Sequence, residues 1–196
     1  MNNKILFKLV LFQIIVIALS NWIINYHFDF YNIIISYAAF TFPLVVVATD
    51  LTVRVLGKQI GRIVVGLTFI PAILISMFIV YLSGAPIEVA LRIGAGSGCS
   101  YLVSTLLDVS VFQYFREKCK QWWIAPTFSS IVTMFIDTYT FYFVAFYKNT
   151  QSVYVQDWIP AATNHAIIKI AISLIIVLPL YGILLNYIQK KMLKIN

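Results

Sequence analysis

Six long runs of apolar residues alternate with short polar or charged links along the chain. A helix needs about 20 mostly apolar residues to cross a bilayer, because it rises only about 1.5 Å per residue. Each run has that length, and such short links typically join antiparallel neighbours. The pattern predicts an all-α integral membrane protein, a compact six-transmembrane-helix bundle in one transmembrane domain over residues 1–196. The predicted spans are 5–24, 33–53, 63–83, 89–112, 122–146 and 162–188.

The composition supports this class. Hydrophobic residues make up 61% of the chain and charged residues 11%, whereas soluble domains are about half apolar and a quarter charged. The 15 Phe, 12 Tyr and 4 Trp exclude a disordered chain. The two cysteines have no His or Cys neighbours at metal-ligand spacing. We therefore expect neither a structural zinc site nor a disulfide framework.

The basic residues predict an orientation, because Lys and Arg collect in cytoplasmic loops. Lys and Arg are concentrated at the two chain ends and in every second link between spans. The remaining links, which are predicted to lie outside, contain only one such residue, Lys148. Both termini are therefore predicted to be cytoplasmic and the 148–160 link to lie outside. The net charge of +7 follows from this distribution, so no nucleic-acid partner is expected. The basic side carries Lys4, Lys8, Arg54, Lys58, Arg62, Arg116, Lys118, Lys120, Lys190, Lys191 and Lys194.

Charged residues inside the spans are candidate functional sites, because a charge in hydrocarbon costs several kcal/mol. Asp137 and Lys169 both fall roughly 12–15 Å from the outer ends of their spans, near the bilayer midplane. One interpretation is a structural ion pair between neighbouring helices. We favour a polar cavity, since two apolar residues would hold the helices together equally well. The full set of candidates is Asp50, Arg54, Arg92, Asp108, Asp137 and Lys169.

Asp50 and Arg54 are four residues apart with the acid first, the favourable spacing for an ion pair within one helix. On the residues alone, this structural interpretation is preferred for the two. Pro43 falls in the middle of the predicted second span, where it is expected to kink or break the helix. Broken helices in transporters bring free backbone groups to the ligand.

Two further patterns have a packing and a functional interpretation. Tyr139 and Phe141 follow Asp137 closely and suit lipid-facing packing, but one of these rings would also stack on a flat ligand held by the carboxylate. A carboxylate accepts from adjacent ring N–H and exocyclic NH₂ donors in one plane, as on a guanine edge. Gly94 and Gly98 have the small-xxx-small spacing of close helix packing.

The sequence resembles the queuosine precursor transporter family, also called vitamin uptake transporters. The most specific segment is residues 42–57, in which Phe-Pro precedes an apolar run, Thr-Asp and a polar turn that ends in Gly57. Residues 106–112, 122–127, 137–138 and 178–182 resemble its later spans in order and spacing. The resemblance implies an inner-membrane importer of a 7-deazaguanine, typically 7-cyano-7-deazaguanine (preQ0), for queuosine synthesis in tRNA.

The resemblance also implies that Asp50, Arg54, Arg92, Asp108, Asp137 and Lys169 bind the substrate. The chain departs from the family at Met134, where many members carry an amide shortly before the acid of span five. The choice among preQ0, preQ1 and queuine therefore stays open, as does the driving force.

The sequence lacks the signatures of two alternative functions. The substrate-binding component of an energy-coupling-factor importer has a similar size and six helices, but commonly shows Ala-x-x-x-Ala in its first helix, where this chain has only Ala18. A membrane enzyme acting on lipid needs clustered acids or a His-based site, and neither pattern is present. The sequence contains no nucleotide-binding loop of the Gly-x-x-x-x-Gly-Lys-Ser/Thr type, so ATP is not expected to drive transport from within this chain. We expect no enzyme and no cofactor. The predicted partners are the small molecule and the bilayer, and a homodimer is compatible with the sequence.

Overall fold

The computed structural model describes residues 3–23, 26–30, 33–148 and 158–193. Six helical segments are long and apolar enough to cross a membrane, which confirms the predicted six-helix bundle. The first five are α1 (Asn3–Ile23), α2 (Ala38–Leu56), α3 (Lys58–Leu82), α4 (Ile87–Lys118) and α5 (Ile124–Phe146). The sixth joins α6 (Trp158–Ile172), a π-helical turn η1 (Ser173–Val177) and α7 (Leu178–Leu193).

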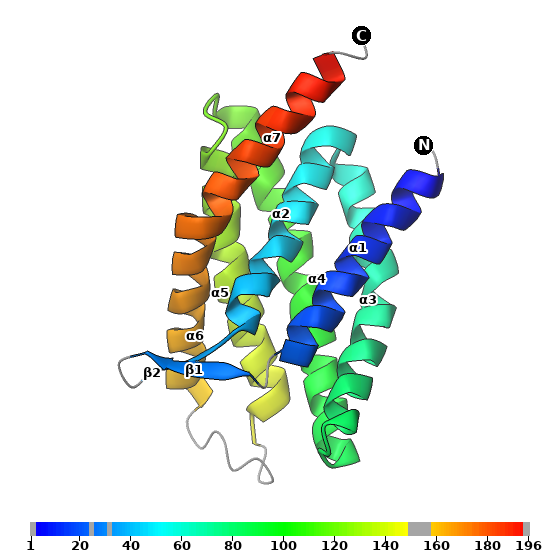
Figure 1. The fold of residues 1–196 in the computed structure, drawn as a ribbon, viewed down its shortest axis with the longest axis vertical. Coiled ribbons are helices and arrows are strands. Elements are labelled where there is room, and N and C mark those ends of the chain that lie inside the picture. Colours follow the sequence, from blue (N-terminus) through cyan, green and yellow to red (C-terminus); the bar gives the residue numbers. More distant parts are fainter. Residues whose placement is uncertain (1–2, 24–25, 31–32, 149–157, 194–196) are drawn as a thin grey trace.

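Both chain ends lie at one end of the bundle, as an even number of crossings requires (Figure 1). At the opposite end, a short antiparallel hairpin joins α1 to α2 (Figure 1). Its strands are β1 (His27–Phe30) and β2 (Ile33–Ser36), with Cα partners from His27–Ser36 to Phe30–Ile33. The terminal end therefore also contains the links between α2 and α3 and between α4 and α5.

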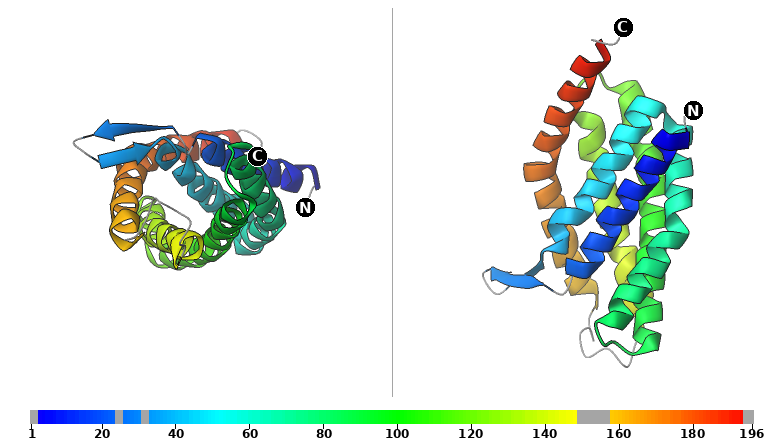
Figure 2. Two further views of the ribbon diagram at one scale, coloured as in Figure 1. Left: turned by 90° about the horizontal axis from the view of Figure 1, so that it is seen from below. Right: turned by 45° about the vertical axis from the view of Figure 1, so that its right-hand side comes forward.

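Helix α2 occupies the centre of the bundle. It packs against α1, α3, α4, α5, α6 and η1, and the view along the bundle shows the other helices arranged around it (Figure 2). Val45, Val46 and Val53 of α2 are completely buried. Polar residues on this helix are consequently surrounded by protein on several sides rather than by lipid.

The hairpin corrects the predicted start of span two. Residues 33–36 were expected to begin a helix but form β2, in keeping with the strand preference of the three consecutive isoleucines. Because α2 begins only at Ala38, Pro43 lies in its second turn and not in the middle of the span. Proline is better tolerated near a helix start, where fewer intrahelical bonds are lost, and α2 continues without interruption to Leu56.

The last span is the irregular one. Pro179 has no N–H to offer the carbonyl of Ile175, and its ring crowds that carbonyl. The π turn η1 contains residue 175 and ends just before this proline, between α6 and α7. The chain changes direction there, so that α7 leans away from the line of α6 (Figure 1). The interruption before Pro179 thus takes the form of a π turn, a feature frequent at functional sites.

Glycines determine two close approaches. Gly57 has a φ of 91°, and this left-handed conformation lets α2 end and α3 begin with a single residue between them. A Cβ added to Gly94 or Gly98 would lie 2.9 Å from Met77 Cβ or 2.0 Å from Ile73 Cγ1 of α3. The small-residue spacing in α4 therefore serves helix packing, as its simpler interpretation predicts.

Candidate functional site: a buried polar column

A column of polar side chains runs along the contact between α4 and α5 and is completed by α2 and α6. Ser129, Thr133 and Asp137 follow one another at four-residue intervals on α5, and Ser104 and Asp108 do so on α4. All five are at most 1% exposed. Because four residues make about one turn, the column extends for about 12 Å through the bundle. The sequence contained this signal in its spacing, but the hydroxyl residues were not predicted as site residues.

Asp137 and Lys169 form an ion pair at the end of this column that is farther from the chain termini. Lys169 Nζ donates to Asp137 Oδ2 at 3.1 Å, and the two side chains are 16% and 2% exposed. Ser104 Oγ of α4 lies 3.5 Å from Asp137 Oδ1, at the limit of a hydrogen bond. The depth estimate placed both charges at one level, and the structure brings them into contact.

An aromatic ring that contacts Lys169 comes from an unexpected helix. Lys169 Nζ lies 4.5 Å from the centre of the Phe42 ring of α2, within the range of a cation–π contact. Phe42 was noted in the sequence for its place beside Pro43, not as a site residue. Since α2 passes through the bundle centre, its second turn reaches the level of the ion pair.

The two rings that were predicted as site residues, Tyr139 and Phe141, pack between helices. Tyr139 shares a 2.6 Å hydrogen bond with Thr163 of α6, and its ring contacts Phe135 and Trp158. Phe141 packs beside Gly96 of α4, and its ring meets those of Tyr142 and Phe146 edge-on. Both rings are half-buried. They therefore form walls between helices beside the ion pair, and the structure shows no contact of either ring with Asp137.

The inner part of the column holds a pair of acids. Asp50 of α2 and Asp108 of α4 are both 0% exposed, and their carboxyl groups lie within hydrogen-bond reach of each other. Ser129 Oγ lies 3.4 Å from Asp50 Oδ1 and 3.3 Å from Oδ2, while Thr133 donates to Asp108 Oδ1 at 3.1 Å. Asp108 Oδ2 has no hydrogen-bonding partner in the described part of the chain.

Arg54 does not form the expected pair with Asp50. Arg54 Nη1 donates instead to the Tyr181 hydroxyl of α7 at 3.2 Å and to the Trp122 carbonyl at 3.4 Å. The prediction of an intrahelical ion pair was therefore wrong. Asp50 turns inward to the hydroxyl of Ser129 because α2 is enclosed at that level, whereas the longer arginine reaches the end of the bundle.

Arg92 lies apart from the other predicted residues. Its Nη1 donates to the Tyr147 carbonyl at 3.4 Å, at the ends of α4 and α5 that lie away from the chain termini. His165 of α6, which precedes Lys169 by one turn, shares a 3.1 Å hydrogen bond with the Tyr142 hydroxyl. The structure thus brings Asp50 together with Asp108 and Asp137 together with Lys169, and it leaves Arg54 and Arg92 near opposite ends of the bundle.

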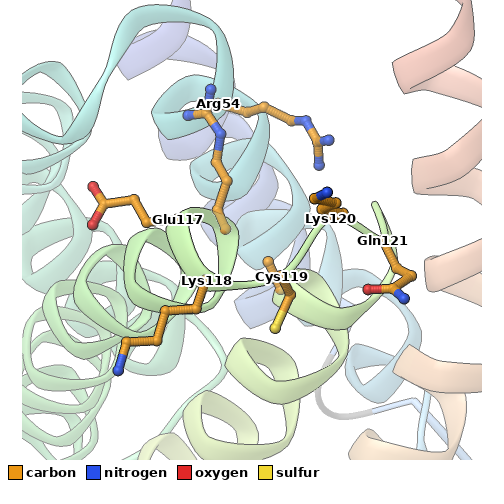
Figure 3. Close-up of a pocket in the computed structure, with 8 residues that line it drawn as sticks. Arg54, Glu117, Lys118, Cys119, Lys120 and Gln121 are labelled. Atoms are coloured by element: carbon orange, nitrogen blue, oxygen red, sulfur yellow. The ribbon is translucent and has the colours of Figure 1, made fainter.

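A pocket of about 420 Å³ opens at the end of the bundle that holds both termini. Its lining includes Arg54, which is one helical turn beyond Asp50, and Ala125 at the start of α5. Figure 3 shows Lys118 extending away from its neighbours, in agreement with its hydrogen bond to Tyr114. The other lining residues are Arg116, Glu117, Cys119, Lys120 and Gln121. Within the described segments there is no group of three His, Cys, Asp or Glu residues arranged to hold a metal ion.

A second polar network, in the other half of the bundle, is neutral. Gln13 Nε2 of α1 donates to Thr49 Oγ1 of α2 at 3.1 Å, and the Tyr101 hydroxyl of α4 donates to Gln13 Oε1 at 2.5 Å. All three residues are at most 1% exposed. Each polar atom is paired within the network or with nearby backbone, so this region holds α1, α2 and α4 together without carrying a charge.

Known proteins resemble this chain over most of its length. The family described as "Putative vitamin uptake transporter" matches residues 36–184. The "Queuosine precursor transporter" of Escherichia coli (strain K12) is 34% identical over 200 residues, covering 96% of this chain and 90% of that protein. The "Probable queuosine precursor transporter" of Haemophilus influenzae is 30% identical over 204 residues, covering 92% and 86% respectively. No solved structure is significantly similar.

The matched region contains the polar column, from Phe42 and Asp50 to Lys169. The similarity also extends over nearly the full length of both relatives. The chain is therefore a multi-pass membrane protein, and it belongs to the queuosine precursor transporter family, which is also described as the vitamin uptake transporter family.

Proposed function

We propose that the protein imports a queuosine precursor, a 7-deazaguanine such as preQ0, across the cell's inner membrane. The observation that carries this proposal is the similarity to two proteins named as queuosine precursor transporters over nearly their whole length. The protein acts as a transporter and not as an enzyme, and the chain constitutes one transmembrane domain.

The substrate binds at the Asp137–Lys169 pair. A 7-deazaguanine keeps the ring N–H and exocyclic NH₂ of guanine, which donate in one plane to the two oxygens of a carboxylate. Ser104 makes only a 3.5 Å contact to Asp137, so a stronger donor replaces it at little cost. Lys169 keeps the buried carboxylate compensated throughout. Phe42 offers a ring against which the flat base stacks.

The other predicted residues serve the path on either side of this pair. Arg92 lies towards the outer entrance, and Arg54 borders the pocket at the opposite end. Asp50 and Asp108 lie between the ion pair and that pocket. Tyr139 and Phe141 shape the wall formed by α4, α5 and α6. A substrate that passes along the column thus meets polar groups at successive turns.

A complementation experiment tests the function. The chain is expressed alone in a host that lacks both precursor synthesis and its own importer, and queuosine in tRNA is measured after preQ0 is supplied. We expect queuosine to be restored. Rescue that depends on a co-expressed ATPase module would instead support the energy-coupling-factor alternative, which the names of the relatives do not favour.

The orientation is tested separately. We propose cytoplasmic termini and an outer link at 148–160, most of which lies outside the described residues. A C-terminal fluorescent fusion should fold and fluoresce, whereas a C-terminal alkaline phosphatase fusion should be inactive, because that enzyme requires the oxidising periplasm for its disulfides. An active phosphatase fusion would contradict the proposed orientation.

A further inference from the structure

The inner acids have an imbalance of charge that the outer pair does not have. Asp50 and Asp108 contribute two carboxyl groups with no exposed surface. Their hydrogen-bond donors are the neutral hydroxyls of Ser129 and Thr133. Two adjacent carboxylates without a cationic partner would be strongly destabilising in such an environment. The geometry therefore requires something positive between them.

The charged and titratable side chains around these two acids form hydrogen bonds or ion pairs with other groups. Arg54 of α2 donates to Tyr181 and Trp122, and Arg116 of α4 donates to the Val53 carbonyl at 3.2 Å. Tyr181 of α7 engages Arg54. On the outer side, Lys169 of α6 engages Asp137 of α5. Each of these groups has a partner other than Asp50 or Asp108.

A proton fits this place better than a larger ion. The two carboxyl groups lie within hydrogen-bond reach, and Asp108 Oδ2 has no donor in the described part of the chain. Two bare carboxylates cannot hydrogen-bond to each other, but one proton supplies the missing donor and removes one of the two charges. The remaining charge is balanced through space by Arg54, one helical turn away on α2.

The location connects this proton site to both water and substrate. Arg54 lines the 420 Å³ pocket at the terminal end, so the pair lies about one turn from a route to solvent. In the other direction, the inner acids are one helical turn from the ion pair on both helices. Thr133 precedes Asp137 by four residues on α5, and Asp108 follows Ser104 by four residues on the antiparallel α4. Binding at either site is therefore sensed by the same two helices.

We propose that the Asp50–Asp108 pair carries a proton that is transported inward together with the substrate. The pair binds one proton from the outer side while the substrate occupies the Asp137–Lys169 site, and it releases that proton through the Arg54 pocket when the bundle opens towards the terminal end. No covalent bond of the substrate changes. The proposal rests on the proposed function for the identity of the substrate and for the direction of transport.

Transport in proteoliposomes tests the coupling. One pH unit corresponds to a tenfold concentration ratio, so one proton per substrate sustains about tenfold accumulation of labelled preQ0 at a gradient of about one unit. We expect this accumulation in the wild type and its collapse with a protonophore. Asp108→Asn and Asp50→Asn should lose accumulation yet retain counterflow, the exchange of external labelled preQ0 for internal unlabelled preQ0 at equal pH.

Two variants serve as references. Asp137→Asn should lose both accumulation and counterflow, because it removes the acceptor for the substrate. Glu88→Gln makes the same chemical change at an exposed acid of α4 and should behave like the wild type. Gradient-driven accumulation that persists in Asp108→Asn, or that survives the protonophore in the wild type, would overturn the proposal. Loss of counterflow in folded Asp108→Asn would assign the pair to the substrate site instead.

An infrared measurement addresses the proton without any substrate. The carbonyl band of a protonated carboxyl group should be present in the purified wild type, change with pH, and shift in D₂O. It should remain in Asp137→Asn and disappear in the Asp50→Asn/Asp108→Asn double variant. Absence of the band from the wild type at every pH would refute the proton site. Failure of preQ0 transport with the band present would refute only the choice of substrate.

Discussion

The two acidic regions of the polar column differ in how their buried carboxyl groups are compensated. At the outer end, Asp137 meets Lys169 at 3.1 Å, so two opposite charges compensate each other. One turn further in, Asp50 and Asp108 meet only each other and two hydroxyls. The three acids are buried to the same degree, at most 1% exposed, whereas the Lys169 side chain is 16% exposed. Burial alone therefore does not predict how replacing an acid changes stability. The change is destabilising where a lone charge remains and stabilising where a repulsion between two acids is removed.

The largest effect is expected at the outer pair. Asp137→Asn and Lys169→Ala each leave an uncompensated buried charge, which costs about 3–5 kcal/mol in soluble proteins. Each should lower protein abundance and abolish preQ0 uptake. The informative variant is Asp137→Leu with Lys169→Met, measured by immunoblot and by uptake of labelled preQ0.

In that double variant, abundance should return because no lone charge remains, whereas uptake should stay absent. A variant in the neutral Gln13–Tyr101 network serves as the control, because it should lower stability without changing uptake per folded molecule. Recovery of uptake together with abundance would show that the pair only joins helices, and it would falsify the substrate-site assignment while leaving the family membership intact.

A smaller effect is expected from that neutral network. Tyr101→Phe removes the hydroxyl that donates to Gln13 and leaves a buried amide oxygen without its donor. This should cost about 1–3 kcal/mol and lower the thermal unfolding temperature in detergent. Uptake per molecule of folded protein should remain at the wild-type level. A selective loss of uptake would mean that the network takes part in transport.

The smallest effect on stability, and the opposite sign, is expected at the inner pair. Asp108→Asn removes one of two adjacent acids, keeps an oxygen for Thr133 and adds an N–H donor towards Asp50. A gain of about 1 kcal/mol would raise the unfolding temperature by about 2–4 °C in a chain of this size. A clear decrease, similar to that of Asp137→Asn, would mean that both regions are ordinary compensated pairs.

Much of the architecture could be predicted from local pattern. Six apolar runs were sufficient for six helices, because a chain in lipid must satisfy its backbone hydrogen bonds within each span. The spacing of Gly94 and Gly98 predicted a close helix contact, and the depths of Asp137 and Lys169 placed them at one level. These features depend on the rise and period of a single helix and hence on sequence neighbours.

Other features depended on which helices meet. The first turn predicted at residues 33–36 is a strand, because pairing with residues 27–30 outweighed the apolar run. The Asp50–Arg54 spacing favoured an intrahelical pair, but Asp50 turned to Ser129 of another helix. Phe42 reached Lys169 across 127 residues of sequence only because α2 lies at the centre of the bundle.

The sequence alone thus determined the class of protein, the number of spans and the family, since these follow from hydropathy along the chain and from motifs in order. Only the tertiary structure decided which charges are compensated. The energy of a buried carboxylate depends on atoms within a few ångströms, and those atoms come from helices that are distant in sequence. Asp137 has a lysine as its partner, whereas Asp50 has a second acid. This difference results from helix packing and is not encoded in the periodicity of any one span.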